Sequence, residues 1–170
     1  MKTKVKAFTL IELLVVVAII GILASVGVVA YNGYTSSAKV NIIKRQVDDI
    51  EKFIATKMAM CEIDGGSLGL FAPSGWNQTL YNPGHCNNSS VEQMMYGFGN
   101  HINWTWKPQN VYVANNNAVS STKSRNPSQG FINFDWSTDS NGKKYFIITA
   151  NLGDHLGSDK IYQKKVYHWQ

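Results

Sequence analysis

The chain has 170 residues, with 16 Lys and Arg against 11 Asp and Glu, and a formal net charge of +5. Three of the basic residues are Lys2, Lys4 and Lys6, so the rest of the chain carries 13 basic and 11 acidic residues. This near balance does not produce the basic surface typical of nucleic-acid-binding proteins. The length excludes two full domains and allows one small domain with extensions.

A basic segment, residues 1–7, precedes an apolar stretch that predicts a membrane helix. Residues 13–30 contain no charged residue and no proline, a length that suits a bilayer span. A cleavable secretory signal and a plain single-pass anchor are two interpretations of this stretch. Neither gains from Glu12, which lies among apolar residues where a carboxylate costs several kcal/mol. Glu12 therefore favours a third interpretation, in which the carboxylate has a partner.

The residues around Glu12 supply that third interpretation. The segment Lys6-Ala7-Phe8-Thr9-Leu10-Ile11-Glu12-Leu13 closely resembles the leader and cleavage motif of type IV prepilins. That motif joins a short basic leader, a small residue, an aromatic residue and a Glu, and about twenty apolar residues follow. The resemblance in sequence ends near Lys39.

The resemblance implies that a prepilin peptidase cuts between Ala7 and Phe8 and methylates the new amino group of Phe8. Family members usually have Gly before the cut, and Ala7 departs from that pattern. The family also implies that Glu12 pairs with the cationic N-terminus, at Phe8, of a neighbouring subunit. Many members carry a proline near the position of Val29, so this chain leaves any kink there in doubt.

Beyond residue 31 the apolar pattern becomes amphipathic. Residues 8–61 are predicted to form one helix, with a membrane-spanning or filament-core half at 8–31 and an amphipathic half at 32–61. The predicted buried face of the second half recurs at three- and four-residue steps, and it comprises Val40, Ile43, Val47, Ile50, Ile54, Met58 and Cys61.

Residues 62–170 are predicted to form a globular head that contains a loop and a sheet. The Gly-, Asn-, Ser- and Pro-rich stretch 62–108 predicts a loop, with a short helical turn near 91–95. The predicted strands follow at 111–114, 131–136, 145–150 and 161–168. A long helix packed on a C-terminal antiparallel sheet is an α+β fold, and its architecture resembles the pilin fold.

The two cysteines, Cys61 and Cys86, allow one disulfide. An exported chain meets an oxidising compartment, where a bridge that closes this loop stabilises the fold by about 3 kcal/mol. Two free thiols are the alternative. A zinc site that combines these cysteines with His85 and His101 matches no usual ligand spacing. The sequence therefore predicts no metal, no cofactor and, since it contains no catalytic constellation, no enzyme activity.

The resemblance implies a structural subunit of a type IV pilus, a surface filament for adhesion, motility or DNA uptake. The subunit is expected in the inner membrane before assembly and in an extracellular filament afterwards. Its expected partners are other copies of itself, the prepilin peptidase and the inner-membrane assembly machinery. One alternative is a pseudopilin of a type II-like secretion system. Another is a minor pilin whose head binds DNA or a receptor, with Lys160, Lys164 and Lys165 as candidate contacts.

Overall fold

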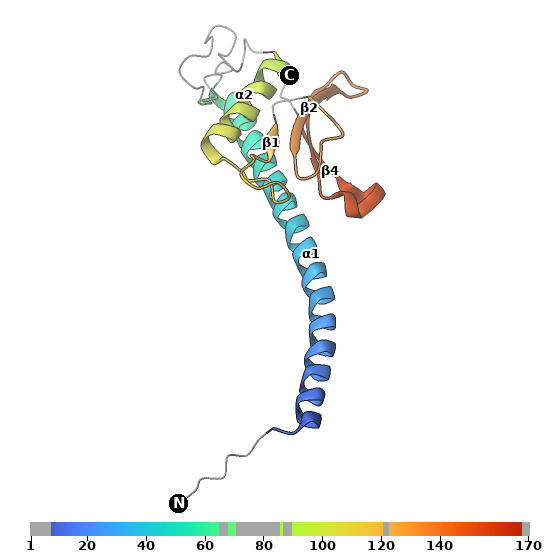
Figure 1. Cartoon of the computed structure of the whole chain (residues 1–170). Coiled ribbons are helices and arrows are strands. Elements are labelled where there is room, and N and C mark those ends of the chain that lie inside the picture. The colour runs from blue at the N-terminus through green and yellow to red at the C-terminus, as the bar shows by residue number, and fades with distance from the viewer. Residues whose placement is uncertain (1–7, 65–67, 71–85, 87–89, 121–122, 168–170) are drawn as a thin grey trace, which may run out of the picture. The chain divides into compact units, whose positions relative to one another are not determined.

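The computed structural model contains one long helix, a small sheet and shorter helices (Figure 1). The chain divides into two compact units, Met1–Ala38 and Lys39–Gln170, which are described separately. Helix α1, Leu10–Asp64, contributes to both units. The leader and part of the predicted loop lie outside the described residues, which are 8–64, 68–70, 86, 90–120 and 123–167.

In the first unit, the apolar side chains of α1 are exposed on every face. The large apolar residues from Phe8 to Val29 have exposed fractions of 47–82%. Among the residues that the structure describes, α1 is the helix long and apolar enough to cross a membrane. A helix that is apolar all round requires lipid or other protein around it. The helix is continuous through Gly21, Gly27 and Val29.

In the second unit, the C-terminal half of α1 contributes one face to a hydrophobic core. Ile43, Val47, Ile50 and Ile54 are at most 1% exposed, and the stripe continues to Met58 and Cys61. Their three- and four-residue spacing places them on the same side of the helix. They share the core with apolar residues of the sheet and of the second helix.

The sheet has four strands in the order β1-β2-β3-β4. Strand β1, Val119–Ser120, pairs in parallel with β2, Ile132–Thr138. Strand β3, Lys144–Asn151, pairs antiparallel with both β2 and β4, Ile161–Tyr167. The predicted α+β architecture, a long helix packed on a mostly antiparallel sheet, is confirmed. The short parallel strand β1 is an addition to the predicted topology.

The structure extends the short helical turn predicted near 91–95 and corrects the predicted loop over the residues that follow it. Helix α2, Val91–His101, is followed by a π-helical turn, Ile102–Trp106. Ser90 caps α2, because its hydroxyl accepts a hydrogen bond from the Gln93 backbone while the Gln93 side chain accepts one from the Ser90 backbone. The buried face of α2 includes Met94 and Phe98. Two glycines lower the helix propensity of this segment, which obscured it in the sequence.

The predicted strand at 111–114 is also wrong, because this segment forms bends and a turn. The side-chain Oδ1 of Asn110 accepts hydrogen bonds from the backbone N–H groups of Tyr112 (2.8 Å) and Val113 (3.1 Å). A side chain that takes these donors competes directly with pairing in a sheet.

The predicted disulfide between Cys61 and Cys86 is confirmed. The two cysteines are 25 residues apart, and both are buried. Because Cys61 lies in the last turn of α1, the bridge ties the end of this helix to the segment that precedes α2. His85 lies outside the described residues, and no group of metal-binding side chains occurs among the residues described.

Candidate functional site

Glu12 and Thr9 form a reciprocal cap at the start of α1. The backbone N–H and the hydroxyl of Thr9 both donate to Oε2 of Glu12, at 2.8 and 2.7 Å. The backbone N–H of Glu12 in turn donates to the Thr9 hydroxyl oxygen at 3.3 Å. This arrangement is a capping box, which satisfies backbone donors that the first helical turn leaves unpaired.

The capping box corrects the expectation that a plain membrane anchor gains nothing from Glu12. Such an anchor does gain, since the carboxylate caps its own helix. The signal was present in the sequence, because Thr9 precedes Glu12 by three residues at the start of an apolar run. The hydrogen bonds from the Thr9 backbone N–H and from the Thr9 hydroxyl both go to Oε2, so Oε1 is the oxygen that another donor can reach.

A shallow apolar groove lies beside the Glu12 side chain. It has a volume of about 350 Å³ and is lined by Phe8, Ile11, Glu12, Val15 and Val16. Ionic contacts strengthen where apolar walls exclude water, because the effective dielectric constant falls. A cationic partner of Glu12 would therefore be held more strongly if other apolar side chains covered this groove.

The predicted cleavage site lies at the edge of the described structure. Ala7 is outside the described residues, whereas Phe8 is 81% exposed and precedes the first helical turn. Cleavage before Phe8 leaves the amide N–H of Thr9 intact, so the capping box needs no group from the leader. The start of the helix therefore carries the exposed ring of Phe8 and the carboxylate of Glu12, of which one oxygen accepts both hydrogen bonds from Thr9.

Comparison with known proteins places this segment in a family. The family model described as "Prokaryotic N-terminal methylation motif" matches residues 2–28. Residues 2–28 therefore carry a prokaryotic N-terminal methylation motif. The matched residues include the Lys-rich leader, Ala7, Phe8 and the Thr9–Glu12 capping box, so the methylation motif that the sequence predicted is confirmed.

Relatives that match part of this chain are fimbrial and pilin proteins. The chain is 39% identical over 69 residues to the type IV major fimbrial protein FimA of Dichelobacter nodosus, which covers 41% of this chain and 42% of the relative. It is 56% identical over 41 residues to the type IV major pilin protein PilE of Neisseria gonorrhoeae, which covers 24% of this chain and 25% of the relative. The chain thus matches less than half the length of these relatives. No solved structure matches it.

Two of the three candidate lysines near the C-terminus, Lys160 and Lys164, form ion pairs. Lys164 Nζ lies 3.3 Å from an Asp48 carboxylate oxygen and 3.1 Å from a Glu51 carboxylate oxygen, both on α1. Bonds from its ammonium to Glu51 and Asp48 raise the pKa of Lys164 above its usual value. Lys160 pairs with Asp154 at 3.2 Å. The structure does not bring the three lysines into one uncompensated basic patch.

Lys165 differs from its neighbour because successive residues of a strand point to opposite faces. Its ammonium lies 5.0 Å from the centre of the Tyr145 ring. The face that carries Lys164 also carries Tyr162, whose hydroxyl donates to the Asp48 carboxylate at 3.0 Å. Lys164, Tyr162, Asp48 and Glu51 therefore form a polar clamp between β4 and α1.

We expect the substitution Lys164→Met to lower the free energy of unfolding by more than Lys165→Met does, although modestly because the three charged side chains are about one-third exposed. Lys165→Met is the matched control, since Lys165 is exposed. Urea unfolding of the full pilin chain in detergent, followed by tryptophan fluorescence, measures both. Equal effects of the two substitutions would contradict the clamp.

Asp135 is the buried carboxylate of the head. It lies on β2 with its side chain 6% exposed, and it binds Arg125 and Lys123, the latter at 3.3 Å. The backbone N–H of Trp136 also donates to it, at 2.8 Å. Burial raises the pKa of Asp135, but the bonds from Arg125, Trp136 and Lys123 outweigh it, so the pKa is below its ordinary value.

A lowered carboxylate pKa predicts loss of stability in acid. The contribution of Asp135 is complete above the unfolded-state pKa of about 3.9, and it disappears as the pH falls through the lower folded-state value. We expect Asp135→Asn to cost about 2 kcal/mol at pH 7 and to flatten the dependence below about pH 4. Unfolding measured from pH 7 to pH 2 tests this, with exposed Asp159→Asn as control. A parallel pH profile in Asp135→Asn would refute the assignment.

Proposed function

We propose that this chain is the structural subunit of a type IV pilus and polymerises through its N-terminal helix. The observation that carries this proposal is the match of the methylation motif to residues 2–28, a segment that includes Phe8 and Glu12. The fimbrial relatives support it, since they are 39% identical to this chain over 69 residues and 56% identical over 41 residues.

Processing prepares the helix for assembly. Lys2, Lys4 and Lys6 hold the leader on the cytoplasmic side of the inner membrane, which leaves the head on the outer side. A prepilin peptidase then cuts between Ala7 and Phe8 and methylates the amino group of Phe8. The new N-terminus is cationic, and it precedes the capping box by one residue.

Assembly pairs this amino group with Glu12 of a neighbouring copy. Oε2 of Glu12 is already satisfied by Thr9, so the incoming cation meets Oε1. An unpaired carboxylate in hydrocarbon is costly, and pairing removes much of that cost. The filament therefore offers Glu12 a better environment than the lone subunit has in lipid. The exposed apolar residues of α1 bury one another in the filament core.

The assembled chain leaves the inner membrane and becomes part of an extracellular filament. The inner-membrane pilus machinery drives this transfer, and the partners within the filament are further copies of the same chain. Each segment of the chain has one role in this proposal. Residues 1–7 are removed, residues 8–31 form the filament core, residues 32–61 connect the core to the head, and residues 62–170 form the head.

Mass spectrometry of filaments sheared from cells tests this function. We expect the purified filament to contain this chain with its N-terminus at Phe8, one methyl group on that amine and an intact disulfide. Cells without prepilin peptidase activity provide the control, in which the chain retains Met1 and stays in the membrane fraction. Filaments that lack this chain, or that contain it with the leader attached, would contradict the proposal.

A further inference from the structure

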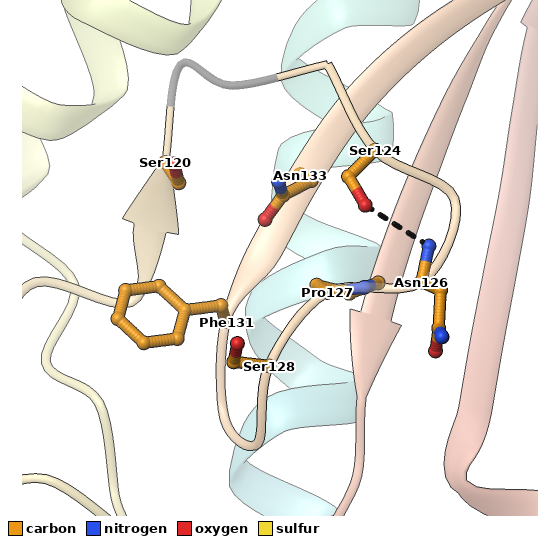
Figure 2. Close-up of a pocket in the computed structure, with 7 residues that line it drawn as sticks. All are labelled: Ser120, Ser124, Asn126, Pro127, Ser128, Phe131 and Asn133. Carbon is orange, nitrogen blue, oxygen red and sulfur yellow. Dashed lines mark hydrogen bonds between the residues drawn. The ribbon is translucent and has the colours of Figure 1, made fainter.

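A small polar pocket lies on the head, between the end of β1 and the loop that leads into β2. Its volume is about 290 Å³. Figure 2 shows the loop from Ser124 to Phe131 curving around it, with Asn133 drawn between Ser120 and Ser124. Hydroxyl and amide groups from Ser120, Ser124, Asn126, Ser128 and Asn133 line the pocket together with the ring of Phe131.

The lining residues that the structure describes are uncharged. The two basic residues that flank Ser124, Lys123 and Arg125, are both bound to the buried carboxylate of Asp135. This carboxylate balances one of the two cations, and one positive charge remains near the pocket. The lining side chains themselves offer neutral hydrogen-bonding groups and one aromatic ring.

The loop around the pocket is held in place by bonds to the sheet. The carbonyl of Pro127 accepts a hydrogen bond from the buried Asn151 side chain at 3.0 Å. The N–H of Gly130 donates to the carbonyl of the same Asn151 at 2.9 Å. Asn110 donates to the carbonyl of Gln129 at 3.1 Å. A loop fixed in this way loses little conformational entropy when a ligand binds, which favours recognition.

The lining groups match one class of ligand. Serine hydroxyls and asparagine amides both donate and accept hydrogen bonds, as sugar hydroxyls do. A phenyl ring offers an apolar face to the C–H groups of a sugar ring, and a few placed polar groups then fix its orientation. The volume is near the lower end of ligand pockets, about 300 Å³, which suits one sugar unit rather than an extended chain.

We propose that this pocket binds a neutral sugar residue of a glycan. Asn126 and Ser128 supply hydrogen bonds from the exposed loop, Phe131 supplies the apolar contact, and Asn133 forms part of the buried wall. This binding resides in the head and requires no assembly of the filament, so it stands apart from the proposed structural function.

Saturation-transfer NMR with the full pilin chain tests the proposal. The protein is kept in a zwitterionic detergent without a sugar headgroup, so that the detergent does not compete. The probes are the methyl glycosides of glucose, galactose, mannose, N-acetylglucosamine and N-acetylgalactosamine, with the anionic N-acetylneuraminic acid for comparison. We expect saturation transfer to at least one neutral glycoside, with a Kd of about 1 mM.

Paired variants separate this site from general surface contact. Asn126→Ala with Ser128→Ala is expected to weaken binding at least about fivefold, because two polar partners are lost. Ser140→Ala with Asn141→Ala removes the same two residue types from the exposed β2–β3 turn and is expected to leave binding unchanged. Phe131→Leu keeps apolar bulk and is expected to weaken binding by a similar factor.

Three results would overturn the proposal. One is the lack of transfer to every neutral glycoside with the unaltered chain. Another is equal binding by the Asn126–Ser128 and Ser140–Asn141 double variants. The third is stronger binding of N-acetylneuraminic acid than of any neutral glycoside. The unfolding midpoint of each variant is measured in parallel, and Phe131→Leu provides an independent reading if the double variant unfolds.

Discussion

Replacing Glu12 with alanine is expected to reduce filament yield at least tenfold while the chain is still inserted and cleaved. The carboxylate is a cost in the lone membrane helix and a gain in the filament, so its removal favours insertion and opposes assembly. A loss of about 1.4 kcal/mol per subunit contact suffices for a tenfold change. Quantifying sheared filaments against total processed chain measures the effect. Normal filament yield would contradict the account.

Two neighbouring variants distinguish the charge of Glu12 from its capping role. Glu12→Gln keeps an acceptor for the Thr9 N–H and hydroxyl, since Gln also serves in capping boxes, but it removes the charge. Thr9→Ala keeps the charge and removes the cap, at about 1 kcal/mol of helix stability. We expect Glu12→Gln to assemble as poorly as Glu12→Ala, and Thr9→Ala to show a milder defect. The reverse ranking would show that capping is the main role.

Removing the disulfide is expected to produce the largest loss of stability in the head. Substitution of both Cys61 and Cys86 by alanine should lower the free energy of unfolding by about 3 kcal/mol, because the bridge closes a 25-residue separation. The midpoint of thermal unfolding should fall by about 10 °C. Near-ultraviolet circular dichroism of the full chain in detergent follows the transition.

Reduction of the unaltered chain provides the matched control for the disulfide. Dithiothreitol should bring its midpoint close to that of the double alanine variant, and it should leave the variant itself unchanged. A double variant that unfolds at the same midpoint as the oxidised chain would contradict the stabilising role of the bridge.

The long helix could be predicted from sequence because its signals are strong and local. Eighteen uncharged residues specify the membrane half, and a stripe with helical spacing specifies the packed half. The residues of that stripe are buried in the structure. The role of Thr9 as a helix cap was not predicted, although Thr9 and Glu12 have the three-residue spacing of a capping box.

The head was harder to predict because its decisive interactions are specific side-chain contacts. Strands β2, β3 and β4 have alternating or continuous apolar residues, and these patterns predict strands. Helix α2 contains Gly97 and Gly99, which lower its helix propensity, and most of it was predicted to be loop. The bends after Asn110 depend on one amide side chain. The pairing of Lys164 with Asp48 joins residues that are far apart in the chain, and no local pattern announces it.

A density map of the assembled filament tests the central claim most directly, because it gives the distance between the Phe8 nitrogen of one subunit and Glu12 of its neighbour. The account predicts a separation of about 4 Å or less, with Oε1 facing the neighbour's amine and Oε2 on Thr9 of its own chain. A filament in which this separation exceeds about 8 Å, with Glu12 bonded to Thr9 alone, would contradict it.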